Sequence, residues 1–290
     1  MRVMATTTQV PKSRSTSRRG LPETFRLTKT KCDTLALLAE YFCLRTNDVA
    51  SILRGRIPTE SDKRTLRHTL GSLYKSGLVY RLPYLDLERE RGPVNYVYGL
   101  SDKGVKYCAE FYNGRCKTFD DHSQRTLDHE LEISMFHFAI KGLCIRKHFS
   151  LYWQQNDLKC TVNPDTMFAI TNPALPDGKN TFYYFLEIER AKMGNYKDGE
   201  PSIMRKLGRY YEYYDSTDCK KEWGSFEHFR VVVVQRTDDR RNNLLQELRL
   251  RFNHRMFWLT TESLYKADIG ASIFRTPKDL DARDYSFLDI

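Results

Sequence analysis

The chain lacks the sequence features of a membrane-bound, secreted or disulfide-stabilised protein. No apolar run approaches the roughly 20 residues that a membrane-spanning helix needs, and the N-terminus has no apolar signal-peptide core. The seven cysteines are scattered, with no CxxC pair among them, so neither a disulfide framework nor a structural zinc site is suggested. We therefore expect a cytoplasmic protein whose thiols are reduced and mostly buried.

Excess positive charge is also missing from most of the chain. Residues 118–290 hold 25 Lys or Arg against 26 Asp or Glu. The surplus lies in residues 1–31, with eight Lys or Arg against one Glu, and in residues 32–117, with 14 against 10. This distribution predicts a polyanion contact at the N-terminal end and a nearly neutral C-terminal domain.

The 290 residues suffice for two domains behind an N-terminal arm. Residues 1–31 are predicted to form a flexible basic arm, because the segment is rich in Ser, Thr, Arg and Lys and has few apolar anchors. Arg18 and Arg19 in this arm are candidates for contact with phosphates or a minor groove. A tail that only improves solubility is the alternative.

Residues 32–115 show three helical patterns followed by two strand patterns. Apolar residues recur at helical spacing in segments 33–44, 46–55 and 61–79, with Ser61 as the predicted N-cap of the third helix. Strand-like segments 78–86 and 95–100 then flank a charged loop, and a helix is expected to start at Ser101 or Asp102. Three short helices joined by tight turns predict a helix-turn-helix unit.

From Cys32 to Tyr112 the chain resembles the winged helix-turn-helix family, in which an aromatic strand ends in a Leu-Ser-x-x-Gly step like that from Leu100 to Gly104. The resemblance implies DNA binding by the third helix, with the loop as the wing. The residues expected to contact DNA are Lys63, Arg64, Arg67, His68 and Lys75 on the helix and Arg89 and Arg91 on the wing. Winged helices also serve as protein-interaction modules, so a partner protein is the alternative.

Residues 120–290 predict an α/β domain with a mixed sheet. An apolar helix over 125–145 precedes strand-like runs 150–157, 159–171 and 182–190. Helix 201–216, the buried strand 229–236, helix 242–252 and strand 256–263 complete the order. The fold class is therefore α/β in two domains.

Carboxylates gather in the pattern of this second domain. Asp165 precedes one strand, and Glu187 and Glu189 end the next, on one face of that strand because side chains alternate. If the two strands pair, the carboxylates converge at one sheet end, where divalent metals find oxygen ligands. Glu130 is a fourth carboxylate, on an apolar helix where an unpaired charge is costly. Solvated charges at strand ends are the alternative.

The order of these acids, with Asp165 after Pro164, resembles the PD-(D/E)XK restriction-endonuclease-like superfamily. The resemblance implies that Glu130, Asp165 and Glu187 bind Mg²⁺ or Mn²⁺ and that the site is that of a metal-dependent DNA endonuclease or nickase. The sequence departs from the pattern at Glu189, which occupies the position of the catalytic Lys. Lys206, in a Lys-x-x-x-Tyr segment similar to the Gln-x-x-x-Tyr motif of some branches, would supply the ammonium, or Glu189 would bind a second metal. A degenerate nuclease fold that only binds DNA or protein is the alternative.

As a whole, the stretch from Cys32 to Leu264 resembles the replication-relaxation family, which joins a winged helix to a nuclease-like domain and occurs with plasmids and other mobile elements. The most specific matches are His129-Glu130, Pro164-Asp165, the acidic strand end from Glu187 to Arg190 and the Lys-Leu-x-x-Tyr helix segment that begins at Lys206. The resemblance implies a nickase or relaxase acting in plasmid mobilisation or replication in a bacterial cell, associated with the nucleoid or a plasmid. A non-catalytic DNA-binding regulator or accessory factor is the alternative. The expected partner is double-stranded DNA and no membrane; mobilisation or replication proteins and a second copy of the chain are further candidates.

Overall fold

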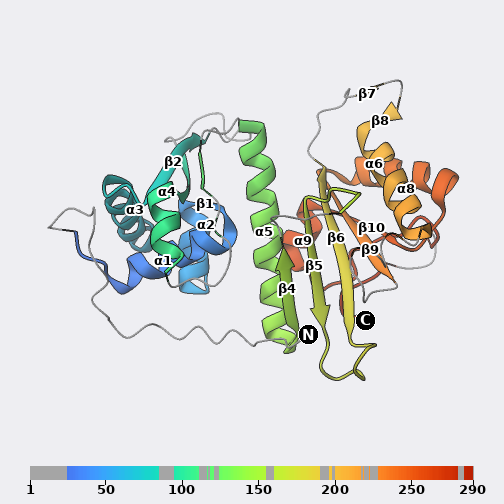
Figure 1. Ribbon diagram of the computed structural model, residues 1–290, viewed down its shortest axis with the longest axis horizontal. Helices are drawn as coiled ribbons and strands as arrows, with labels where there is room; N and C mark the ends of the chain where they lie inside the picture. Colours follow the sequence, from blue (N-terminus) through green and yellow to red (C-terminus); the bar gives the residue numbers. More distant parts are fainter. Residues whose placement is uncertain are drawn as a thin grey trace. The chain divides into compact units, whose positions relative to one another are not determined.

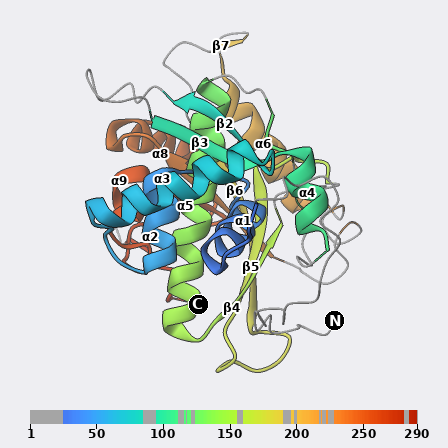
Figure 2. The ribbon, with the colours of Figure 1, turned by 90° about the vertical axis from the view of Figure 1, so that its left-hand side faces the viewer.

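The computed structural model divides the chain into two compact units (Figures 1 and 2). Unit 1 is Met1–Ser134 and unit 2 is Met135–Ile290. The division falls within one long helix, α5 (Gln124–Lys147), whereas the sequence pattern predicted a boundary before this helix. The structure describes residues 25–84, 95–110, 116, 118–120, 124–154, 160–189, 196–197, 200–216, 218, 222, 228–279 and 284–289.

Unit 1 combines helices with a small antiparallel sheet. Its three strands lie in the order β1-β3-β2, and both pairings are antiparallel. Its elements ahead of α5 are α1 (Lys29–Tyr41), β1 (Cys43–Arg45), α2 (Thr46–Arg54), α3 (Glu60–Lys75), β2 (Val79–Tyr84), β3 (Asn95–Leu100) and α4 (Asp102–Cys108). The three predicted helices and two predicted strands are therefore present in the predicted order.

One boundary of the first helix was predicted wrongly. The helical pattern was extended through Leu44, but α1 ends at Tyr41 and Cys43–Arg45 forms β1. Phe42 adopts a φ of 63°, which ends the helix and turns the chain into the strand that pairs with β3. Strand pairing thus overrides the local helical period.

The sheet of unit 1 packs against Phe119, which follows α4 in the chain, and against the start of α5. Buried side chains from all of these elements form one cluster, which consists of Cys43, Leu82, Val97, Phe119, Leu127 and Leu131. Gly99 in β3 allows the close packing, because a Cβ at this position would lie 2.3 Å from the Cβ of Phe119. Burial of these apolar side chains is the main force that holds the sheet to α5.

Unit 2 is an α/β unit around a mixed sheet, as the sequence predicted, and its five strands lie in the order β10-β9-β6-β5-β4. The pairs β4–β5 and β5–β6 are antiparallel, whereas the pairs β6–β9 and β9–β10 are parallel. The strands are β4 (Ser150–Gln154), β5 (Thr166–Thr171), β6 (Thr181–Glu189), β9 (Phe229–Gln235) and β10 (Phe257–Thr261), with the short pair β7 (Tyr196–Lys197) and β8 (Glu200–Pro201) before α6.

Helices cover both faces of this sheet (Figure 1). On one face, α6 (Ser202–Asp215) and α8 (Asp238–Phe252) pack through residues such as Leu207 and Leu245 against Phe185 and Val231. On the other face, Phe136 of α5 contacts Phe168 of β5 and Tyr265 of α9 (Glu262–Asp268). No helix in the described part of the chain is long and apolar enough to cross a membrane.

Candidate functional site

Asp165 is held at the point where β5 begins. It lies one residue before Thr166, which pairs with Leu186 of β6. One oxygen of its carboxylate, Oδ2, accepts a hydrogen bond of 2.7 Å from the backbone N–H of Ile188. The two strands are therefore locked together at the end that carries the acidic residues, and the second oxygen of Asp165 is left to face α6.

Glu187 lies on β6 and points toward the face that α6 covers. Side chains alternate along a strand, so Glu187 shares this face with Phe185, which packs against α6. The residue is only 3% exposed. Its carboxylate accepts a hydrogen bond of 2.5 Å from the Tyr210 hydroxyl and forms a 2.5 Å ion pair with Lys206. A buried carboxylate with these partners satisfies the requirement that buried charges be paired.

Lys206 joins the two carboxylates. Its Nζ lies 2.5 Å from Glu187 Oε2 and 3.5 Å from Asp165 Oδ1, and its side chain is 22% exposed. Lys206 and Tyr210 are four residues apart on α6, so both side chains lie on the same face of the helix. This spacing brings an ammonium and a hydroxyl to the same strand end, and we call the set Asp165, Glu187, Lys206 and Tyr210 the α6 cluster.

Burial and neighbouring charges perturb the pKa values of the α6 cluster. Burial, followed by the nearby charge of Asp165, raises the pKa of Glu187, whereas Lys206 and Tyr210 act in the opposite direction and favour the charged carboxylate. Burial would lower the pKa of Lys206, but the Glu187 and Asp165 carboxylates together raise it. Burial and the Glu187 charge raise the pKa of Tyr210 well above its usual value. Perturbed titratable groups held together in this way are typical of functional sites.

The two carboxylates fit a hard divalent cation. Mg²⁺ commonly binds through one or two carboxylates and completes its coordination with water and substrate phosphates. Asp165 and Glu187 converge from adjacent strands on one ammonium, which shows that their oxygens reach a common cationic position. Within the described ranges, no group of three or more His, Cys, Asp or Glu side chains is placed to hold a metal ion. A metal at this site would therefore depend on two carboxylates and on its substrate.

The remaining acidic candidates lie differently. Glu130 is in the part of α5 that belongs to unit 1, and its carboxylate lies 4.0 Å from His129. Burial raises the pKa of the Cys43 thiol, and the charge of Glu130 raises it further. Glu189 is the last residue of β6, opposite Gln235 of β9, and is partly buried. The structure thus brings together Asp165, Glu187 and Lys206, and it places Glu130 with the other unit.

Tyr210 was not among the predicted site residues. Its hydroxyl is a direct partner of Glu187 inside the core. The signal that identifies it is the Lys-x-x-x-Tyr spacing, because residues four apart on a helix face the same surface. Tyr210 orients Glu187 so that one carboxylate oxygen remains directed at Lys206.

In unit 1, the side chains predicted to contact DNA lie mostly on the exposed surface of α3. Leu66, Leu70 and Leu73 bury the opposite face of this helix. Lys63 is partly buried, and the exposed residues are Arg64, Arg67, His68 and Lys75. The other predicted contacts, Arg18, Arg19, Arg89 and Arg91, lie outside the described residues.

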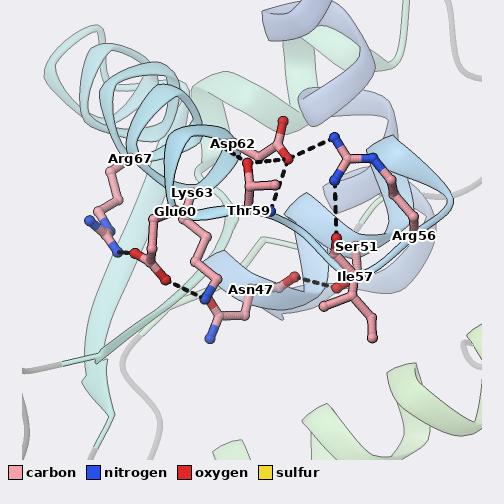
Figure 3. Close-up of polar contacts among 9 residues, drawn as sticks. All are labelled: Asn47, Ser51, Arg56, Ile57, Thr59, Glu60, Asp62, Lys63 and Arg67. Carbon is pink, nitrogen blue, oxygen red and sulfur yellow. Dashed lines mark hydrogen bonds and ion pairs between the residues drawn. The ribbon is translucent and has the colours of Figure 1, made fainter.

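The turn between α2 and α3 fixes how the start of α3 is presented (Figure 3). The N-cap is Thr59 and not Ser61 as predicted, because the Thr59 hydroxyl accepts from the N–H of Asp62 while Asp62 accepts from the N–H of Thr59. This capping box satisfies two backbone donors at the helix end. Asp62 also pairs with Arg54 at 3.1 Å and Arg56 at 2.9 Å, which ties the turn to α2.

These features define a two-unit α/β protein with an exposed basic helix in one unit and a buried carboxylate–lysine cluster in the other. The chain belongs to the replication-relaxation family, whose family model matches residues 35–228, and this confirms the family predicted from the sequence. A comparison with curated proteins found no match. Among solved structures, the chain is similar to the restriction endonuclease FokI, with 15% identity and a TM-score of 0.33. The match covers 91% of the chain but spans only 47% of the length of FokI.

Proposed function

We propose that the protein binds the DNA of a plasmid or other mobile element and nicks one strand at the α6 cluster in a reaction that requires Mg²⁺ or Mn²⁺. The observation that carries this proposal is the position of Lys206, whose ammonium reaches both Asp165 and Glu187. A lysine at this position supplies the positive charge that Glu189, at the end of β6, cannot supply.

Each residue of the α6 cluster has a distinct role in this proposal. Asp165 and Glu187 would hold the metal ion, which supplies Lewis acidity at a phosphate oxygen when bound. Lys206 donates hydrogen bonds to the phosphate oxygen that gains negative charge as the attacking oxygen approaches phosphorus. Tyr210 holds Glu187 in place through its hydroxyl, and the backbone N–H of Ile188 does the same for Asp165.

Unit 1 would bring this site to DNA as a winged helix. Supporting this role are the element order of α1 to β3, the antiparallel β2–β3 pair and the exposed basic face of α3. In helix-turn-helix proteins the second helix of the motif enters the major groove, and its N-terminal residues contact base edges. The capping box and ion pairs around Asp62 give α3 a fixed start for such contacts.

The catalytic proposal is tested with supercoiled plasmid in the presence of Mg²⁺ or Mn²⁺. We expect the wild type to convert supercoiled DNA to the open circular form, and Asp165→Ala and Glu187→Ala to lower the rate at least 100-fold. Asp177→Ala, which removes an exposed carboxylate from the β5–β6 loop, is the matched control and should nick at the wild-type rate. Nicking that both active-site substitutions leave unchanged would mean that another site is responsible.

A second candidate function is non-catalytic DNA binding, as a regulator or accessory factor. The observation that favours it is the direct ion pair between Lys206 and Glu187, which already neutralises one of the two candidate ligands. This alternative predicts that sequence-preferring DNA binding survives chelation of divalent metal while no nicking occurs. Binding with and without EDTA, measured on the preparation used for the nicking assay, separates the two functions.

A further inference from the structure

The first turn of α3 carries two acidic residues with different surroundings (Figure 3). The Asp62 side chain is mostly buried and accepts hydrogen bonds from the N–H and the hydroxyl of Thr59, at 3.0 and 2.8 Å. These hydrogen bonds, with Arg56, lower the pKa of Asp62 to about 2. Asp62 therefore serves the capping box and the turn, and its role is structural.

Glu60, by contrast, is 75% exposed and pairs along its own helix. Its carboxylate lies 2.7 Å from Lys63 and 3.7 Å from Arg67. The hydrogen bond and charge of Lys63 lower the pKa of Glu60, so the carboxylate is ionised at neutral pH. Exposed ion pairs of this kind, and the favourable position of an acid in the first turn of a helix, each contribute less than about 1 kcal/mol to stability. The fold therefore gains little from an acid among the cations of a helix that would face DNA.

The position of Glu60 is also unfavourable for simple phosphate binding. Glu60 is the first residue of α3, where the N-terminal residues of a groove-binding helix approach base edges. A carboxylate there repels phosphates and partly neutralises Lys63 and Arg67. The cost is offset only if the carboxylate meets a hydrogen-bond donor on the DNA, and exposed base edges in the major groove offer such donors.

The three side chains match the major-groove edge of one base pair. Lys63 and Arg67 present donors and Glu60 presents an acceptor, all on one stripe of α3. A G·C pair presents two acceptors, guanine O6 and N7, beside one donor, the cytosine N4 amino group. An A·T pair presents thymine O4 and its methyl group, so an acceptor would face the carboxylate of Glu60 if the pair took this place.

We propose that Glu60, Lys63 and Arg67 form a reading triad for a G·C base pair in duplex DNA. The Glu60 carboxylate accepts from cytosine N4, and the two cations donate to guanine O6 and N7. The weak ion pairs within the triad hold the side chains near the required arrangement and exchange for base contacts when DNA enters. This inference rests on the proposed DNA-binding function of α3 and adds the base pair that α3 selects.

The test uses the full-length protein and a preferred duplex obtained by selection from a randomised pool. Dissociation constants are then measured for duplexes in which each G·C pair of the preferred site is replaced by A·T. At one position the wild type should discriminate roughly tenfold. Glu60→Ala should reduce this discrimination, because only the contacts of Lys63 and Arg67 with guanine remain. It should also tighten binding to the disfavoured duplexes, because a negative charge near the phosphates is removed.

Two further variants keep the test decisive. Asp33→Ala is the matched control, because Asp33 forms a similar intrahelical pair with Lys29 on α1, and its removal should leave the discrimination intact. Glu60→Gln retains an acceptor and gains a donor, and glutamine pairs with adenine N6 and N7, so this variant should shift the preference toward A·T. Circular dichroism confirms that each variant remains folded.

The outcomes separate this inference from the proposed function. Equal discrimination by wild type, Glu60→Ala and Glu60→Gln would overturn the reading triad while leaving DNA binding intact. Loss of discrimination in Asp33→Ala as well would also overturn it, since the effect would then be one of net charge. Absence of any duplex binding by the wild type would instead overturn the proposed DNA-binding function of unit 1.

Discussion

The two units use the same chemical groups in opposite environments. In unit 1, Glu60 pairs with Lys63 and Arg67 on the exposed surface of α3. In unit 2, Glu187 pairs with Lys206 inside the core, and Asp165 lies 3.5 Å from the same ammonium. Exposed pairs are weak and screened by salt, so their members can exchange partners, whereas buried pairs carry a desolvation cost that the neighbouring charges must offset.

In the function that we propose, this contrast separates DNA recognition by unit 1 from the chemistry of the α6 cluster. The exposed cations on α3 can leave their ion pairs for DNA at little cost, which suits reversible binding. The α6 cluster keeps its carboxylates and ammonium at fixed distances, which suits a preorganised reactive site. Substitutions in the two clusters should therefore differ in kind, with stability affected mainly in unit 2 and affinity mainly in unit 1.

The largest difference is expected in the free energy of unfolding. Lys206→Met leaves the Glu187 carboxylate buried without its ammonium, and we expect it to cost about 3 kcal/mol. Adding Glu187→Gln removes the unpaired charge, so the double variant should recover most of this loss. Urea unfolding of the wild type, both single variants and the double variant gives the coupling energy.

The exposed pair between Lys29 and Asp33 on α1 is the control for this cycle. Its coupling energy should be no more than about 0.5 kcal/mol, as for other intrahelical surface pairs. A loss below about 1 kcal/mol for Lys206→Met, or equal coupling energies for the two pairs, would remove the distinction between a buried and an exposed charge cluster.

A second difference concerns the loss of folding stability in acid. His137 is buried in unit 2 with its ring stacked on Trp153, and burial, followed by the charge of Lys141, lowers its pKa to about 3. Between pH 6.5 and 3 the unfolded chain binds a proton at this residue and the folded chain does not, so stability falls as the pH falls through this window. At pH 5 the loss from His137 should be about 2 kcal/mol relative to pH 7.

His137→Phe keeps a ring against Trp153 and removes the titrating group, so it should abolish this part of the acid sensitivity. The measurement is urea unfolding of wild type and variant at pH 7 and pH 5. An unchanged difference between the two proteins at both pH values would show that His137 does not couple protonation to the folding of unit 2.

The smallest of these effects is expected for DNA affinity. Replacing Arg64 and Arg67 by Ala removes two exposed cations from α3, and we expect roughly tenfold weaker duplex binding. The slope of the logarithm of the affinity against the logarithm of the salt concentration should become shallower by about two units, one for each lost phosphate contact. Arg249→Ala/Arg251→Ala on α8 removes the same charge from exposed positions of unit 2 and is the matched control. Undiminished binding by the α3 variant would contradict the choice of recognition helix, and fluorescence anisotropy at several salt concentrations measures both quantities.

Much of the fold followed from hydrophobic periodicity. The order of helices and strands in unit 2 could be predicted because the strands are short apolar runs and the helices are amphipathic. The approach of Asp165 to the end of β6 followed from strand pairing, and the position of Lys206 on the same face as Tyr210 followed from helical spacing.

Other features depend on tertiary contacts that no local pattern records. The strand β1 has three residues and follows a helical pattern without interruption until Phe42, so only its pairing with β3 defines it. From the sequence, Ser61 and Thr59 are equally plausible N-caps of α3. The structure selects Thr59 because Thr59 and Asp62 exchange hydrogen bonds in a capping box. The α5 helix is apolar on several sides, and the sequence therefore does not reveal that Glu130 belongs to unit 1.

The most direct test of the central claim is a single substitution, Glu187→Gln, examined for nicking and for DNA affinity in the same preparation. Glutamine keeps the size of the side chain and an acceptor for Tyr210 and Lys206, but it lacks the negative charge that a divalent cation requires. We predict that nicking of supercoiled plasmid with Mg²⁺ falls at least 100-fold while the dissociation constant for duplex DNA is unchanged. Wild-type nicking by Glu187→Gln would contradict the assignment of the α6 cluster as the reactive site.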